Sequence, residues 1–120
     1  MPGNLITFPT ASVQLATTPG TDLYTCPAAT RAQIRKLVVL NTTGTARTVT
    51  VHIARGGAAN ADNNQIVSAA AVPIETTAPQ GVELFGVEGQ LLNPTDVLRA
   101  FSDGASGAAL TAMGCVVEFT

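Results

Sequence analysis

The fold is decided by residues 34–53, which read IRKLVVLNTTGTARTVTVHI. The first part of this stretch is rich in β-branched residues. In the second part, valine and isoleucine alternate with threonine and His52, which is the period of a strand with one buried face. Asparagine, threonine and glycine at residues 41–44 are typical turn residues. The stretch therefore predicts an antiparallel hairpin, with Val51 in the core and His52 on the polar side.

Segments of the same kind flank this hairpin, separated by glycine, proline and asparagine. The alanine-rich segment 66–74 is expected as a strand, because Pro73 and the neighbouring valine and isoleucine oppose a helix. Short strands at this spacing predict an all-β, single-domain antiparallel β-sandwich, jelly-roll or immunoglobulin-like, with about eight strands. The expected strands cover residues 12–16, 23–26, 34–40, 49–53, 66–74, 82–85, 95–101 and 109–119.

Residues 1–11 are expected as an extended N-terminal arm that precedes the sandwich domain of residues 12–120. Proline and glycine interrupt any regular element in the arm, yet Leu5, Ile6 and Phe8 are apolar and need a surface that buries them. Ten extended residues span at most about 33–36 Å, enough to reach a neighbouring copy. We therefore expect these three side chains to contact another subunit. The alternative is an arm that folds back on its own sandwich.

The composition indicates a protein that associates with other proteins. Charged residues make up 12% of the chain and the net charge is −2, whereas about a quarter of the residues in an average domain are charged. No basic patch predicts nucleic-acid binding, and no apolar run approaches the ~20 residues of a membrane helix. Residues 1–10 lack the pattern of a signal peptide, which predicts synthesis in the cytosol. A surface buried against other subunits is favoured over a neutral, threonine-rich free surface.

No group of residues predicts an active site. His52 is the single histidine of the sequence, no GxSxG nucleophile motif is present, and aromatic residues for a sugar-binding cleft are scarce. Cys26 and Cys115 lack metal-ligand spacing, and we expect buried free thiols, with a disulfide as the alternative. The polar loop of residues 56–64 is long for a strand connection, and such loops are often functional. The sequence thus predicts no catalytic residue, no metal site and no cofactor.

Five segments follow one another in a recurring order. They are residues 23–27 (LYTCP), 31–40, 41–44 (NTTG), 48–52 (TVTVH) and 96–100 (DVLRA). In this order the chain resembles, over about residues 21–119, the small β-sandwich structural proteins of tailed-bacteriophage virions. These proteins include head decoration (cement) proteins and head-fibre or tail-associated modules.

The resemblance implies a virion component that is assembled in the host cytoplasm and has no catalytic residues. It implies a homotrimer seated on the major capsid protein or another virion protein, with neither nucleic acid nor a membrane as partner. The expected function is capsid decoration, in which contacts between subunits stabilise the phage head. The alternative is a tail-associated or receptor- or carbohydrate-binding module, and the scarcity of aromatic residues argues against carbohydrate.

Overall fold

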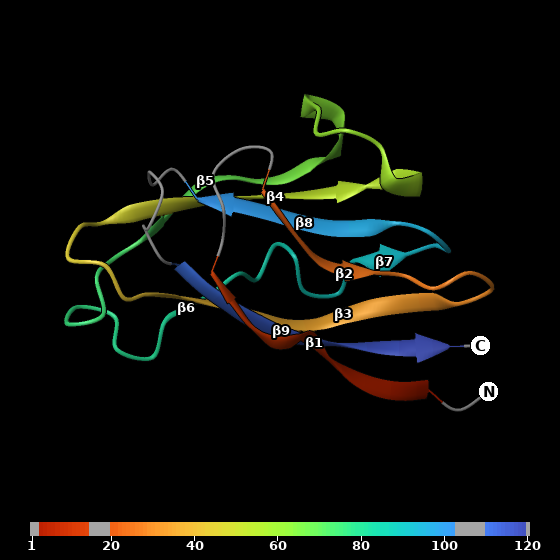
Figure 1. The fold of residues 1–120 in the computed structure, drawn as a ribbon, viewed down its shortest axis with the longest axis horizontal. Coiled ribbons are helices and arrows are strands. Elements are labelled where there is room, and N and C mark those ends of the chain that lie inside the picture. Colours follow the sequence, from red (N-terminus) through yellow and green to blue (C-terminus); the bar gives the residue numbers. More distant parts are fainter. Residues whose placement is uncertain (1–2, 15–19, 103–109, 120) are drawn as a thin grey trace.

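Two β-sheets packed face to face form the protein in the computed structural model, which describes residues 3–14, 20–102 and 110–119 (Figure 1). Sheet A has the strand order β1-β9-β3-β6, with β7 also paired to β3, and sheet B has the order β2-β8-β4-β5. The strands are β1 (Gly3–Gln14), β2 (Thr21–Thr25), β3 (Arg31–Asn41), β4 (Arg47–Ala54), β5 (Gln65–Val72), β6 (Val82–Glu83), β7 (Leu91–Leu92), β8 (Val97–Ser102) and β9 (Leu110–Phe119). Two 3₁₀ turns, η1 (Arg55–Gly57) and η2 (Asp62–Asn64), follow β4.

The predicted all-β sandwich is confirmed, with nine strands in the described part of the chain where about eight were expected. Seven of the expected strands are present with their ends shifted by up to three residues. The expected strand of residues 12–16 is instead the end of a longer strand that begins at Gly3. Residues 15, 16 and 109, which were expected in strands, lie outside the described residues. The short strand β7 was not predicted. It falls in the stretch of residues 86–94, where Gly86, Gly89, Asn93 and Pro94 favour turns.

The strand order is that of a jelly roll. Four antiparallel pairings nest within one another along the chain, as in one long hairpin: β1 with β9, β2 with β8, β3 with β6 and β7, and β4 with β5. Two further antiparallel pairings, β9 with β3 and β8 with β4, roll this hairpin into two sheets. An immunoglobulin-like sandwich, the other predicted form, divides its strands between the sheets in a different way.

The predicted hairpin between residues 34–40 and 49–53 is wrong. Both strands exist, as β3 and β4, but they belong to different sheets. One side of β3 pairs with β9 and the other with β6 and β7, while β4 lies between β8 and β5. The turn after β3 therefore carries the chain from sheet A to sheet B.

A buried asparagine fixes this crossing. Asn41, at the end of β3, is fully buried, and its Nδ2 donates hydrogen bonds to the carbonyl oxygens of Thr45 at 2.9 Å and Val72 at 3.0 Å. Its Oδ1 accepts hydrogen bonds from the backbone N–H and the hydroxyl of Thr43, at 2.9 and 2.6 Å. One side chain thus shapes the corner loop and ties the end of β3 to the end of β5.

Small aliphatic side chains fill the space between the sheets. Val51 is fully buried, as predicted, and valine, leucine and isoleucine from both sheets surround it. Fully burying one such side chain stabilises the fold by about 1.5–3 kcal/mol. The rings of Phe8 and Tyr24 add an aromatic contact, with centroids 6.0 Å apart, where β1 and β2 approach each other.

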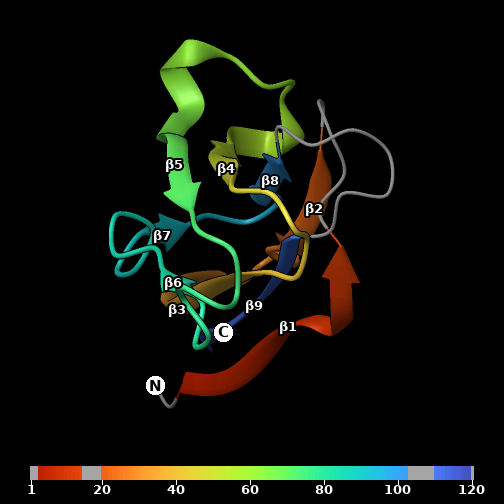
Figure 2. The ribbon, with the colours of Figure 1, turned by 90° about the vertical axis from the view of Figure 1, so that its left-hand side faces the viewer.

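Residues 3–14 form strand β1 at the edge of sheet A. This strand spans the predicted boundary between the arm of residues 1–11 and the sandwich domain of residues 12–120. Figure 2 shows β1 running along the bottom of the molecule and then bending up toward β2. Phe8 is 2% exposed and faces Gly114 of β9, where a Cβ would lie 1.9 Å from the Lys36 carbonyl oxygen and 2.8 Å from the Phe8 ring. Phe8 is therefore buried in its own domain. Ile6 is half-buried and Leu5 is 67% exposed, and their contact with another subunit stays a prediction.

Candidate functional site

His52, the single histidine, is buried rather than solvated. Its side chain lies on the outer side of sheet B, as the alternation with Val51 predicts, but it is 3% exposed. The ring stacks on Phe101 of β8, with centroids 5.9 Å apart and planes inclined by 22°. His52 is buried there because the segment of residues 55–64, here called the covering loop, folds back over this side of sheet B (Figure 1).

The covering loop holds His52 through Asn64. Asn64 Oδ1 accepts a hydrogen bond from the backbone N–H of Ala61 at 3.0 Å, and its Nδ2 donates to the carbonyl oxygen of Ala59 at 3.0 Å. These two bonds orient the amide, so its oxygen faces His52 Nδ1 at 2.6 Å. His52 Nδ1 must therefore carry a hydrogen and donate it to Asn64. In this arrangement His52 anchors the covering loop.

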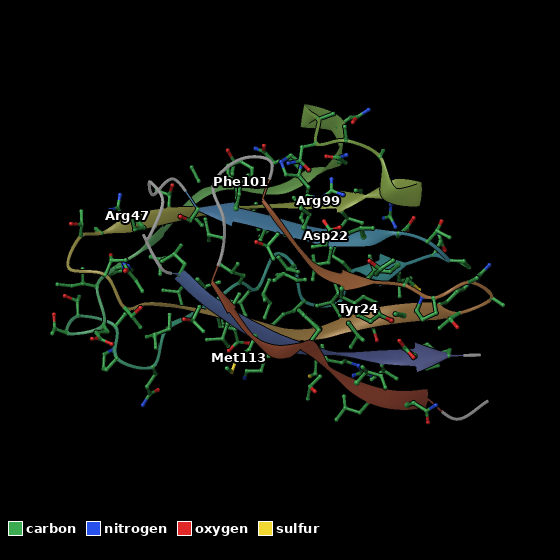
Figure 3. The ribbon with its side chains drawn as sticks, in the orientation of Figure 1. Asp22, Tyr24, Arg47, Arg99, Phe101 and Met113 are labelled. Atoms are coloured by element: carbon green, nitrogen blue, oxygen red, sulfur yellow. The ribbon has the colours of Figure 1, made fainter. Side chains whose placement is uncertain are left out.

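Arg99 of β8 anchors the other part of the covering loop. Its Nη1 donates hydrogen bonds to the Ala58 carbonyl oxygen at 3.1 Å and to Asn60 Oδ1 at 3.0 Å, while its Nε donates to Asp22 Oδ1 of β2 at 2.6 Å. Figure 3 shows Arg99 and Asp22 side by side on neighbouring strands. The Arg99 side chain is 14% exposed. Together His52 and Arg99 attach the loop to β4 and β8, so the loop covers the part of the outer side of sheet B around these two residues.

A buried carboxylate joins the start of the covering loop to the segment before β8. Asp96 is 3% exposed and accepts hydrogen bonds from Arg55 Nη1 at 2.5 Å and from the backbone N–H groups of Gly56 at 2.9 Å and Asn93 at 2.8 Å. Burial alone would raise the pKa of Asp96, but these three hydrogen bonds outweigh it and hold the pKa below its usual value. Asp96 is therefore an ionised structural group.

Both cysteines are free thiols, as predicted, but the predicted burial holds for Cys26 and not for Cys115. Cys26 is buried after β2, where its Sγ donates to the Thr30 carbonyl oxygen at 3.3 Å, and burial raises its pKa. Cys115 of β9 is half-buried on the outer side of sheet A. Near Cys26, the Tyr24 hydroxyl donates a hydrogen bond to Glu118. The pKa of Tyr24 is raised, mainly by burial and secondly by this hydrogen bond. A buried, protonated thiol is a poor nucleophile.

The outer side of sheet A carries several apolar side chains and is open to solvent. In β3 and β9 the buried residues Leu37, Val39, Ala112 and Val116 point inward, so their neighbours along each strand point outward. The register places Leu5 opposite Val117, Thr7 opposite Cys115 and Met113 opposite Val38 on this outward side. We call the surface formed by Leu5, Val38, Met113, Cys115 and Val117 the open face.

The open face combines exposed and half-buried apolar side chains. Leu5 is 67% and Met113 51% exposed, and Figure 3 shows Met113 pointing away from sheet B. Leu91 of β7, 62% exposed, lies on the same side of sheet A but is separated from Val117 by Gln33 of β3. An ion pair between Lys36 and Glu83, at 3.4 Å, lies on the same side of sheet A, because Lys36 is opposite Cys115 and Glu83 is opposite Val38. Contiguous exposed apolar surface of this kind marks an interaction site.

The sequence carried a signal for the open face. The runs Leu37 to Leu40 and Cys115 to Val117 are apolar at every position, whereas a strand with one side in water alternates. Such a run indicates a strand that is buried on both faces. In the structure one side of these runs is in the core and the other is on the open face.

In the described ranges, no group of three or more His, Cys, Asp or Glu residues is placed to hold a metal ion. The same part of the chain contains no helix of the length and hydropathy needed to cross a membrane. In comparisons with known proteins, no family model, curated protein or solved structure matches the chain.

Proposed function

We propose that the chain is a structural protein of a tailed-bacteriophage virion, and specifically a decoration (cement) protein that binds the capsid and stabilises the head. The open face is the observation that carries this proposal. The outer side of sheet B is covered around His52 and Arg99 by the protein's own loop, whereas the outer side of sheet A exposes Leu5 and Met113. Permanent interfaces between proteins are large and apolar, so an exposed apolar face supports assembly with a partner as the function.

Charge supports a protein as the partner. β1 and β9 together contribute Glu118 as their single charged residue, and its carboxylate accepts the hydrogen bond from Tyr24 between the sheets. The centres of protein–protein interfaces are depleted in charged residues, while nucleic-acid interfaces are basic. The open face therefore fits the major capsid protein or another virion protein.

The polar groups support a structural role. The groups with the most distinctive chemistry hold the chain together: His52 with Asn64, Arg99 with Asp22, and Arg55 with Asp96. The first pair joins the covering loop to β4, the second joins β8 to β2, and the third joins the start of the covering loop to the segment before β8. The arrangement stabilises a rigid jelly roll, a fold that also serves as a viral capsid domain.

Peptide mapping of washed virions, from the phage or prophage whose genome encodes the chain, tests the proposal. Decoration predicts its peptides at a copy number comparable with that of the major capsid protein. A copy number at the level of tail proteins would instead favour the tail-associated alternative, and washed particles without the chain would contradict both forms.

A variant pair tests the open face directly. Met113→Glu places a charge on the open face at an exposed position, so the domain should keep its melting temperature while its occupancy on particles lacking the native chain falls at least about tenfold. Thr76→Glu, at an exposed position in the turn after Ile74, is the matched control and should bind like the native chain. Equal occupancy for both variants would exclude the open face as the capsid-binding surface.

A further inference from the structure

The first half of β1 is a regular sheet edge without charged residues. Over Gly3–Phe8 six consecutive residues keep an unbroken register with β9, and no other strand of residues 3–14, 20–102 and 110–119 pairs with β1. All 12 residues of β1 are uncharged. Natural proteins normally protect such edges with charged side chains, bulges or very short strands. This edge therefore has the properties of one that is covered in the assembled protein.

The other edges in the described part of the chain are irregular or short. β6 and β7 have two residues each, and β2 shifts register between Asp22 and Tyr24. β5 shifts register twice against β4 and contains Ala69 with a φ of 47°, a left-handed conformation that interrupts an extended edge. The surface best able to pair with the first half of β1 over its full length is thus the same segment of another copy.

We propose that two copies of this chain associate through the first halves of their β1 strands, paired antiparallel about a two-fold axis. A two-fold axis makes such a contact self-complementary, and pairing at a sheet edge uses the backbone N–H and C=O groups that β1 leaves free. Because the segment is uncharged, the symmetry places no like charges opposite each other.

The pairing also joins the two open faces. Leu5 lies on the open face and on the edge strand, so the two copies of Leu5 come close to the axis on the same side of the joined sheet. A two-fold contact gives a closed dimer, which differs from the homotrimer that the resemblance implies. The pairing is a property of the purified chain and does not depend on the proposed virion function.

Sedimentation equilibrium of the purified full chain tests the pairing. The native chain should reach the mass of a dimer as its concentration rises. Leu5→Lys places a lysine on each side of the axis, and lysine is a residue with which natural edges prevent pairing. It should weaken association at least about tenfold. Leu91→Lys, at a similarly exposed position on β7, is the matched control and should associate like the native chain.

Two further measurements separate the outcomes. Circular dichroism and thermal melting should be unchanged in Leu5→Lys, because this side chain is 67% exposed. Amide hydrogen exchange in residues 3–8 should slow as the native concentration rises, and it should not do so in Leu5→Lys. A native chain that stays monomeric at millimolar concentration, a trimer, or a dimer that persists in Leu5→Lys would overturn the proposal.

Discussion

The side-chain amide of Asn41 donates a hydrogen bond to the carbonyl oxygen of Val72 at 3.0 Å, across the corner between the two sheets. Asn41 ends β3 in sheet A and Val72 ends β5 in sheet B. The same side chain also bonds to Thr45 and Thr43 in the corner loop. A single buried amide therefore connects the crossing of the chain with the packing of the sheets.

Asn41→Ala should destabilise the domain by about 3 kcal/mol, because it leaves the buried carbonyl oxygen of Val72 and the loop groups of Thr43 and Thr45 without this partner. Asn41→Asp should also destabilise it, since a carboxylate cannot donate to the two carbonyl oxygens. Urea denaturation measures both effects. Thr45→Ala, which keeps the backbone carbonyl that Asn41 uses, is the control and should change stability by less than about 0.5 kcal/mol. A loss of stability in Thr45→Ala equal to that in Asn41→Ala would contradict this role of Asn41.

The sequence predicted the elements of this corner but not their pairing. Residues 41–44 read as a turn because asparagine, threonine and glycine favour turns locally, and a turn is present. Whether β3 and β4 pair across it depends on β9 and β8, which lie far along the chain and compete for the same edges. Such competition between distant strands leaves no mark in a short window of sequence.

Contacts with distant parts of the chain also explain why the burial of His52 was not predicted. Alternation correctly assigned Val51 to the core and His52 to the outer side of β4. It gave no indication that the covering loop folds over that side, because the attachment depends on Asn64 and on Arg99 of a distant strand. The apolar runs of β3 and β9 carried a signal for the open face, because a strand with one side in water normally alternates.

His52→Ala should destabilise the domain by about 1–3 kcal/mol, since it removes the donor to Asn64 and the ring that stacks on Phe101. Amide exchange in residues 58–64 should become faster, because the covering loop loses an anchor. Arg35→Ala, at an exposed position of β3, serves as the control and should leave both properties near native values. If His52→Ala had native stability and native exchange in the loop, His52 would not be an anchor.

Because of Asp96, the stability of the domain should depend on pH in the acidic range. Its pKa is lowered in the folded state, so its contribution is complete above the unfolded pKa of about 3.9 and is lost as the pH falls through the folded pKa. Asp96→Asn should lower the free energy of unfolding by about 2 kcal/mol at neutral pH. The difference from the native protein should shrink in acid, where native Asp96 is protonated as well. Denaturation at several pH values measures it, and a difference that stays constant from neutral pH to about pH 2 would contradict this role.

The two thiols should react at different rates with an alkylating reagent. Cys26 is 1% exposed and its pKa is raised by burial, whereas Cys115 is half-buried on the open face. In native protein, Cys115 should be modified at least about tenfold faster than Cys26. In denaturant the two rates should converge. Peptide mass spectrometry without reductant follows both sites, and a mass showing a disulfide, or equal native rates, would contradict this arrangement.

A density map of the intact virion by electron cryo-microscopy tests the central claim most directly. The account predicts a jelly roll on the outer surface of the head, with Met113 and Val117 of the open face in contact with the major capsid protein or a neighbouring copy. The covering loop, attached through His52 and Arg99, would lie away from that contact. Particles whose heads lack this density, or in which the open face of every copy points into solvent, would contradict the account.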